Sequence, residues 1–226
     1  MLLRASKEVE HIKTMVLKMA TLAEESVRDA TESFMKCDTE IAQRTIERDS
    51  EINQSEMNID KEVFQCLALK APVAGDLRLL FSIQKINKDL ERIGDHAVNI
   101  SQAAINCFGF GKPIVSAQIR LMSSLTNTML SDAISCFSKT DSQLALNVLE
   151  HDDQVDDLNR AMTREVITLV KQDITSIEAS LELLRVSKNL ERIADLSTNI
   201  AEDVIFHAKA LDVKHRNMSE QLLDQE

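Results

Sequence analysis

The chain has 226 residues and carries 26 lysines and arginines against 37 aspartates and glutamates, a formal net charge of −11. Four glycines, two prolines and 3% aromatic residues are too few for a protein built on β-hairpins and aromatic-rich strands, so we expect an all-helical protein. The acidic balance has no basic stripe, which argues against direct binding to nucleic acid, because phosphate contacts need clustered Lys and Arg.

The four cysteines, Cys37, Cys66, Cys107 and Cys136, form no CxxC pair, and each lies among apolar residues. We interpret them as reduced thiols that pack as small hydrophobic side chains. The sequence shows no signal peptide and no apolar run of membrane-spanning length, so we expect a cytoplasmic protein.

Apolar residues at alternating steps of three and four predict a long first helix, with its stripe at Val9, Ile12, Val16, Met19, Ala23, Val27, Ala30 and Phe34. Asp38 can cap a second helix that runs to about Leu69 and carries Ile41, Thr45, Ile52, Ile59, Val63 and Leu67. Pro72 suits the start of a third helix, which reaches about Asn106. The stretch CFGFGKP, residues 107–113, contains two glycines and a proline and indicates a linker.

Beyond the linker the pattern starts again, with a fourth helix stripe at Ile119, Met122, Leu125, Met129, Ala133 and Phe137. Thr140 with Gln143 predicts a capping box for a fifth helix, and Thr175 with Glu178 predicts another for a sixth. Long helices joined by short connections lie antiparallel to their neighbours. We therefore predict two tandem three-helix bundles, residues 1–108 and 114–212, followed by a polar tail at residues 213–226.

The two predicted bundles share an internal repeat. KDLERIGDHAVNI, residues 88–100, returns as KNLERIADLSTNI, residues 188–200, with eight of thirteen positions identical. DSEIN, residues 49–53, matches DDQVD, residues 152–156. An internal duplication explains both matches.

The repeated segments carry acidic residues on one helix face. Side chains at steps of four stack on a helix, which groups Glu91, Asp95 and Asn99 in the first copy and Glu191, Asp195 and Asn199 in the second. Asp49, Asp152 and Asp156 lie on or beside the buried stripes of the second and fifth helices. Carboxylates so close to a bundle seam repel each other, and protonation, basic neighbours or a bound cation would relieve the repulsion.

The basic neighbours are Lys88 and Arg92 in the first copy and Lys188 and Arg192 in the second. Each arginine lies one step round the helix from its glutamate, so part of its charge points elsewhere. The candidate ligands offer only oxygen, which suits Mg²⁺, Mn²⁺, Ca²⁺ or iron better than Zn²⁺.

The histidines show no repeated ligand pattern. Glu8 with His11 is the single Glu-x-x-His match, so the sequence does not favour a ferritin-type di-iron site. We assign the five histidines ordinary surface or core roles. Gly94 and its counterpart Ala194 indicate that another backbone packs closely there.

Two repeated segments resemble the PhoU family of bacterial phosphate-uptake regulators: DLRLLFSIQKINKDLERIGDHAVNI in the first copy and SKNLERIADLSTNIAED in the second. The resemblance extends from the first helix to about Ala210. It implies two three-helix bundles that bind divalent or trivalent metal ions, often as multinuclear iron clusters, with Mn, Mg or Zn as alternatives. It also implies a cytosolic, frequently dimeric protein without known catalysis. Such a protein restrains the phosphate-starvation response through a sensor histidine kinase and the ATPase subunit of the high-affinity phosphate ABC transporter, and meets the membrane only through these partners.

Carried over by position, the resemblance gives one metal site to Asp49, Glu91 and Asp95, and the other to Asp152, Asp156, Glu191 and Asp195. Asn99 and Asn199 are further oxygen ligands or donors that orient the carboxylates. Asn53 stands where the family pattern has Asp, so we expect the first site to bind fewer or weaker ions.

Three functions stay open at this point. The leading hypothesis is a metal-bound regulatory adaptor, because the sequence has no glycine-rich phosphate loop, nucleophile–base pair or dinucleotide motif. The alternatives are a carboxylate-bridged di-metal enzyme and a metal-free helical scaffold whose acidic faces are solvated.

Overall fold

A computed structural model describes residues 7–110 and 114–210. It contains six long α-helices: α1 (Lys7–Lys36), α2 (Thr39–Lys70), α3 (Ala74–Gly109), α4 (Ala117–Lys139), α5 (Ser142–Gln172) and α6 (Ile177–Lys209), with a 3₁₀ turn, η1 (Ile174–Ser176), before α6. These two ranges contain no β-strand, and none of their helices is long and apolar enough to cross a membrane. The all-α fold class is confirmed, whereas the predicted tail at 213–226 and linker residues 111–113 lie outside the described residues.

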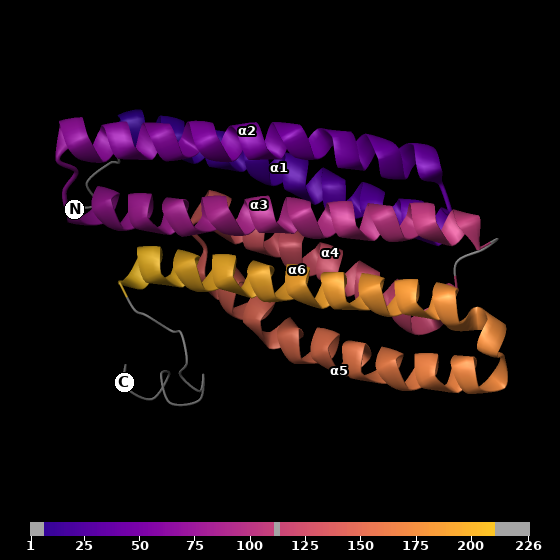
Figure 1. Ribbon diagram of the computed structural model, residues 1–226. Helices are drawn as coiled ribbons and strands as arrows, with labels where there is room; N and C mark the ends of the chain where they lie inside the picture. The colour runs from indigo at the N-terminus through magenta and orange to yellow at the C-terminus, as the bar shows by residue number, and fades with distance from the viewer. Residues whose placement is uncertain (1–6, 111–113, 211–226) are drawn as a thin grey trace, which may run out of the picture.

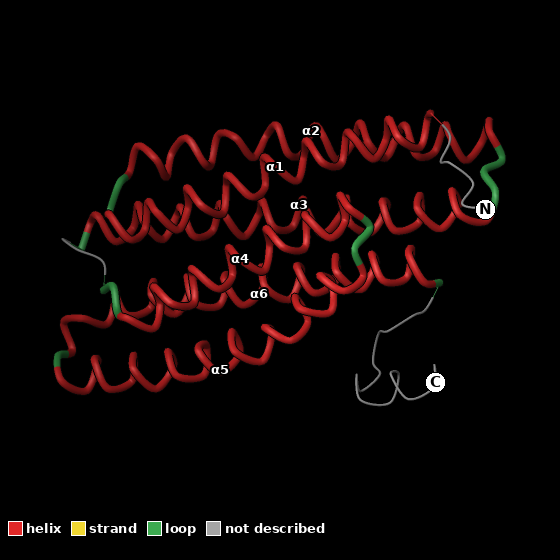
Figure 2. Tube along the Cα trace, turned by 180° about the vertical axis from the view of Figure 1, so that it is seen from behind, coloured by secondary structure: helices red, strands yellow, loops and turns green. Residues whose placement is uncertain are grey.

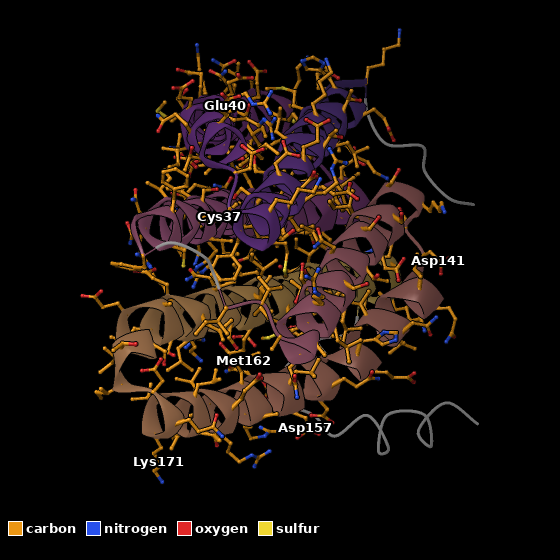
Figure 3. All side chains as sticks on the ribbon, turned by 90° about the vertical axis from the view of Figure 1, so that its right-hand side faces the viewer. Cys37, Glu40, Asp141, Asp157, Met162 and Lys171 are labelled. Carbon is orange, nitrogen blue, oxygen red and sulfur yellow. The ribbon has the colours of Figure 1, made fainter. Side chains whose placement is uncertain are left out.

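The helices form two bundles that meet mainly through α3 and α6 and also through α1 and α4. Figure 1 shows α2, α3, α6 and α5 side by side in that order, and Figure 2 shows α1 and α4 on the opposite side. In the end view of Figure 3, α1 and α2 lie at the top and α5 and α6 at the bottom, with α3 and α4 between them. Helices α3 and α6 therefore occupy the centre of the molecule, each packed against its own bundle and against the other.

The predicted apolar stripes form one continuous core that spans both bundles. Every member of the first-helix stripe is at most 1% exposed. Three stripe members are only partly buried: Ile41, Leu67 and Leu125. All four cysteines are free thiols, and three of them are buried. Burial raises the pKa of the Cys107 and Cys136 thiols to about 12, so both stay neutral and act as small apolar side chains, as predicted.

Two helix turns repeat the same stereochemistry. Cys37 and Thr140 have positive φ angles of 58° and 55°, and each is followed by an aspartate that caps the next helix. The Asp38 side chain accepts from the backbone N–H groups of Glu40 and Ile41, which confirms its predicted role. Cys37 and Asp141, labelled in Figure 3, mark these two turns.

The capping box predicted for Thr140 and Gln143 is wrong. Asp141 is the cap of α5, and its side chain accepts from the N–H groups of Gln143 and Leu144. Thr140 instead closes α4 in the left-handed conformation, which removes it from the capping position. The error arose because Thr140 and Asp141 are adjacent and both residue types can cap a helix. Thr140 takes the left-handed position that ends α4, and Asp141 takes the capping position of α5.

Three further boundaries differ from the predictions. Pro72 lies in the connection before α3, because Ala71 ends α2 in the left-handed conformation and α3 begins only at Ala74. Helix α3 continues to Gly109, so the fully buried Cys107 belongs to the helix and not to the linker. Thr175 does not cap α6: Asp173 accepts from the Thr175 N–H and caps η1, and Ser176 precedes α6 without a side-chain cap.

Polar side chains join α3 to α6 along the central contact. Lys85 pairs with the buried Asp203 at 3.0 Å, the Ser82 hydroxyl donates to the backbone carbonyl of Asp203, and His96 Nδ1 lies 2.8 Å from Asn189 Oδ1. At the other end, the Asn106 amide donates to Glu182. The two helices are therefore antiparallel, which brings the two copies of the acidic motif to the middle of the same layer (Figure 1).

Candidate metal centres

The first acidic seam lies between α2 and α3. Its residues are Asp49 on α2 and Glu91 and Asp95 on α3, which the structure brings close enough to influence one another. Burial raises the pKa of the Asp49 carboxyl, and the negative charges of Asp95 and Glu91 raise it further. The pKa of Asp95 is also raised, by burial and by Glu91.

Gly94 makes room for this seam. A Cβ atom at position 94 would lie 3.0 Å from Ile52 Cδ1 and 3.1 Å from Asp49 Oδ1. The expectation of close packing is met, but side chains of α2 fill the space and not a backbone. The missing side chain lets Asp49 lie directly against α3.

The second acidic seam lies between α5 and α6 and contains Asp152, Asp156, Glu191 and Asp195. Burial raises the pKa of Asp152 to about 6, with further contributions from the charges of Asp195 and Asp156. The pKa of Asp195 is raised by burial and by Glu191. The duplicated sequence therefore forms two corresponding clusters of mutually repelling carboxylates.

The two seams differ at one position, as the sequence indicated. In the first seam the Asn53 amide donates to Asp49 Oδ2 at 2.8 Å. Asp156 occupies the matching place in the second seam and lies 3.4 Å from Arg160 Nη1. The first seam therefore has one carboxylate fewer and an internal amide donor in its place.

Basic and amide neighbours hold the carboxylates apart in this structure. Lys88 pairs with Glu91 at 2.8 Å, Lys188 pairs with Glu191, and Arg192 pairs with Asp195 at 3.1 Å. Within residues 7–110 and 114–210, no group of three or more His, Cys, Asp and Glu side chains is arranged to hold a metal ion. A bound cation would require these carboxylates to leave their local partners and turn toward each other.

The two asparagines of the predicted set lie at the central contact. Asn99 Oδ1 accepts from Arg185 Nη2 of α6 at 3.3 Å. Asn199 lines a small hollow together with Arg92, Arg192 and Asp195. Asn99 therefore has a partner across the bundle contact, and the carboxylates remain the principal oxygen donors of both seams.

The donor chemistry of the first seam fits a hard cation. Asp49 Oδ1 is buried and accepts no hydrogen bond in the described part of the chain, and such an orphaned buried oxygen requires a compensating partner. All the charged donors in both seams are carboxylates, which Mg²⁺, Mn²⁺, Ca²⁺ and iron prefer. When bound, a cation would supply the positive charge that relieves the carboxylate repulsion.

Several polar residues at the centre were not predicted from the sequence. Lys85, Asp203 and Asn189 give no periodic signal, and only the packing of α3 on α6 reveals their role. Arg92 and Arg192 did leave a signal, because each is one step round the helix from the acidic face. The structure places both at the hollow beside Asp195.

A comparison with protein families matches the PhoU domain twice, over residues 16–104 and 119–204. One match falls within each predicted repeat. The phosphate-specific transport system accessory protein PhoU homolog of Pseudomonas putida is 37% identical over 212 residues, covering 93% of this chain and 83% of that protein.

Two solved structures have the same fold. The crystal structure of PhoU from Pseudomonas aeruginosa has a TM-score of 0.88 and 36% identity, covering 90% of this chain and 98% of that one. The phosphate transport system regulatory protein PhoU from Streptococcus pneumoniae has a TM-score of 0.83 and 29% identity, covering 91% of this chain and 97% of that one. Shared domains, length and architecture lead to one conclusion: this chain belongs to the PhoU family.

Proposed function

We propose that this protein is a metal-binding regulator of phosphate uptake that acts through protein contacts and not as an enzyme. Family membership supports the regulatory role, because relatives are named as an accessory protein of the phosphate-specific transport system and as a regulatory protein of phosphate transport.

The observation that carries the metal-binding part is the duplicated pair of carboxylate seams on one layer of the molecule. Each seam joins two helices of the same bundle, so a cation bound there would cross-link α2 to α3 or α5 to α6. Iron or another divalent or trivalent ion suits the oxygen donors. Because the first seam has Asn53 in place of a carboxylate, it binds fewer or weaker ions than the second.

The partners follow from the family resemblance. The ATPase subunit of the phosphate ABC transporter and the sensor histidine kinase are the proposed contacts, and the protein restrains the starvation response on the cytoplasmic side, as a homodimer. Cation binding would remove the repulsion within each seam and make the surface of the α2–α3–α6–α5 layer more rigid. Partners would then recognise the metal-loaded surface.

The first experiment is elemental analysis of protein purified without an affinity tag or chelator. We expect more than one equivalent of iron or manganese in the wild type, and its loss in the double variant Asp95→Asn with Asp195→Asn. The matched control is Asp132→Asn with Asp157→Asn, which removes the same charge outside the seams and should keep the metal. Equal metal content in both double variants, or an empty wild type, would overturn the metal-binding proposal.

A second experiment tests regulation separately. A phosphate-starvation reporter in phosphate-rich medium should be silent with the wild type and active with Asp95→Asn and Asp195→Asn. A silent reporter with a metal-free variant would show that regulation does not need the metal. Steady phosphate release from generic phosphate esters, abolished by Asp195→Asn, would instead support the di-metal enzyme.

A further inference from the structure

A polar hollow of about 290 Å³ lies at the centre of the α3–α6 contact. Helix α3 contributes Arg92, and helix α6 contributes Arg192, Asp195, Leu196, Thr198 and Asn199. Two arginine side chains therefore line one open hollow whose lining contains a single carboxylate. Such a pairing of like charges requires an explanation, because the arginines come from different repeats.

The internal duplication explains how the two arginines meet. Arg92 and Arg192 are equivalent residues of the repeated motif. Since α3 and α6 are antiparallel and joined near both ends, by Lys85 with Asp203 and by Asn106 with Glu182, equivalent positions near the middle lie opposite each other. The presence of both arginines in one hollow is therefore a direct result of the symmetry of the fold.

Nearby carboxylates only partly neutralise these arginines. Arg92 lies 3.6 Å from Asp89, and Arg192 lies 3.1 Å from Asp195 and 3.7 Å from Glu191. The arginine side chains are 52% and 50% exposed. A guanidinium group has five N–H donors, so these contacts leave donors available toward the hollow.

We propose that Arg92 and Arg192 together bind a tetrahedral oxyanion, for which inorganic phosphate is the natural probe. Arginine suits this ligand because its planar fork of donors matches two oxygens of a phosphate. The Asn199 amide supplies a further donor, whereas the Thr198 hydroxyl is already bonded to the Asp195 carbonyl. The role of this site as the effector site of a phosphate-uptake regulator rests on the function proposed above. Binding of the oxyanion itself does not depend on metal.

Asp195 has a specific part in this proposal. Its carboxylate competes with the anion for Arg192, since the two groups are 3.1 Å apart. Removal of that charge, by substitution or by a cation that draws Asp195 into the acidic seam, strengthens oxyanion binding. The two sites are thereby coupled through one side chain.

The test is equilibrium dialysis with radiolabelled inorganic phosphate on chelator-treated full-length protein, with sodium chloride holding the ionic strength constant. We expect saturable binding that is at least tenfold weaker in Arg92→Gln with Arg192→Gln. Each single variant should weaken binding as well, because both arginines contact the anion. Asp195→Asn should bind phosphate several-fold more tightly than the wild type.

The matched control is Arg28→Gln with Arg44→Gln, which removes the same charge from exposed positions on α1 and α2 and should bind like the wild type. Unchanged helical circular dichroism shows that a variant is folded. Equal binding by the two double variants, or no saturable binding by the wild type and by Asp195→Asn, overturns the proposal. The dialysis uses metal-free protein and the metal analysis uses no phosphate, so failure of one proposal does not imply failure of the other.

Discussion

Asp152 shows what the acidic seams cost at the scale of a single residue. Its pKa rises from the ordinary value of 3.8 to about 6 in the folded protein, mainly through burial. Between these values the folded state binds more protons than the unfolded state, so raising the pH lowers stability. The loss begins as the pH passes about 4 and is complete above about 6.

We therefore expect Asp152→Asn to stabilise the metal-free protein at pH 7 by about 1 kcal/mol, because water reaches the partly exposed carboxyl and reduces the full effect. The gain should vanish near pH 3.5, where Asp152 is protonated in both states. Urea unfolding in chelator at both pH values measures it. Asp157→Asn, outside the buried seam, is the control and should show no such pH dependence, and a gain for Asp152→Asn that is equal at both pH values would contradict this account.

Gly94 provides a second prediction at the residue scale. Replacing a helical Gly by Ala normally stabilises a helix by about 1 kcal/mol. Gly75→Ala should show part of this gain, because nothing lies within 4 Å of the added Cβ and the residue lies in the first turn of α3. Gly94→Ala should lose the gain, because its Cβ would crowd Ile52 and Asp49. Thermal unfolding of both variants measures the difference, and equal stabilisation would show that α2 yields easily at this point.

At the scale of the element, the turn between α4 and α5 distinguishes two possible caps. Asp141→Ala should lower the free energy of unfolding by about 1 kcal/mol, because two backbone N–H groups lose their acceptor. Gln143→Ala should have little effect, since the Gln143 side chain takes no part in the observed cap. Denaturant unfolding of the two variants is the measurement, and a larger loss in Gln143→Ala would restore the capping box inferred from the sequence.

The existence of each helix was predictable, whereas two of the three predicted caps were wrong, for a physical reason. The apolar stripes of α1, α2 and α4 repeat over many turns, so every buried position adds to the same signal. A helix end depends on one or two residues, and Thr140, Asp141, Thr175 and Asp173 all have side chains that can cap. Local sequence could not choose between adjacent candidates, because the choice depends on which residue takes the left-handed or extended backbone conformation.

At the scale of the whole molecule, the pair between Lys85 and Asp203 links the two bundles. Asp203 is 1% exposed, so Lys85→Met would leave its buried carboxylate without the positive charge of the lysine. We expect a loss of about 2 kcal/mol, because removing one partner of a buried ion pair is costly. Lys36→Met, which removes an exposed pair with Glu32 on α1, should cost little. Equal losses in chemical unfolding would show that the central contact does not depend on this pair.

The inequality of the two seams is also a property of the whole molecule. Asn53→Asp restores the carboxylate that the second seam has at Asp156 and removes the amide donor to Asp49. If the seams bind metal, this change should raise the bound manganese by about one equivalent under saturating conditions. The added carboxylate gives the first seam one more charged oxygen ligand. Titration followed by elemental analysis measures it, and unchanged stoichiometry would show that Asn53 does not limit the first site.

The sequence by itself determined the helical class, the six helices, the internal repeat and the identity of the acidic residues, because periodicity and duplication are properties of the chain. Only the tertiary structure decided how the repeats meet. The antiparallel packing of α3 on α6 buries Asp203 against Lys85, brings His96 to Asn189 and places Arg92 beside Arg192 in one hollow. Such contacts join residues roughly a hundred positions apart and depend on the relative orientation of two bundles, about which local patterns contain no information.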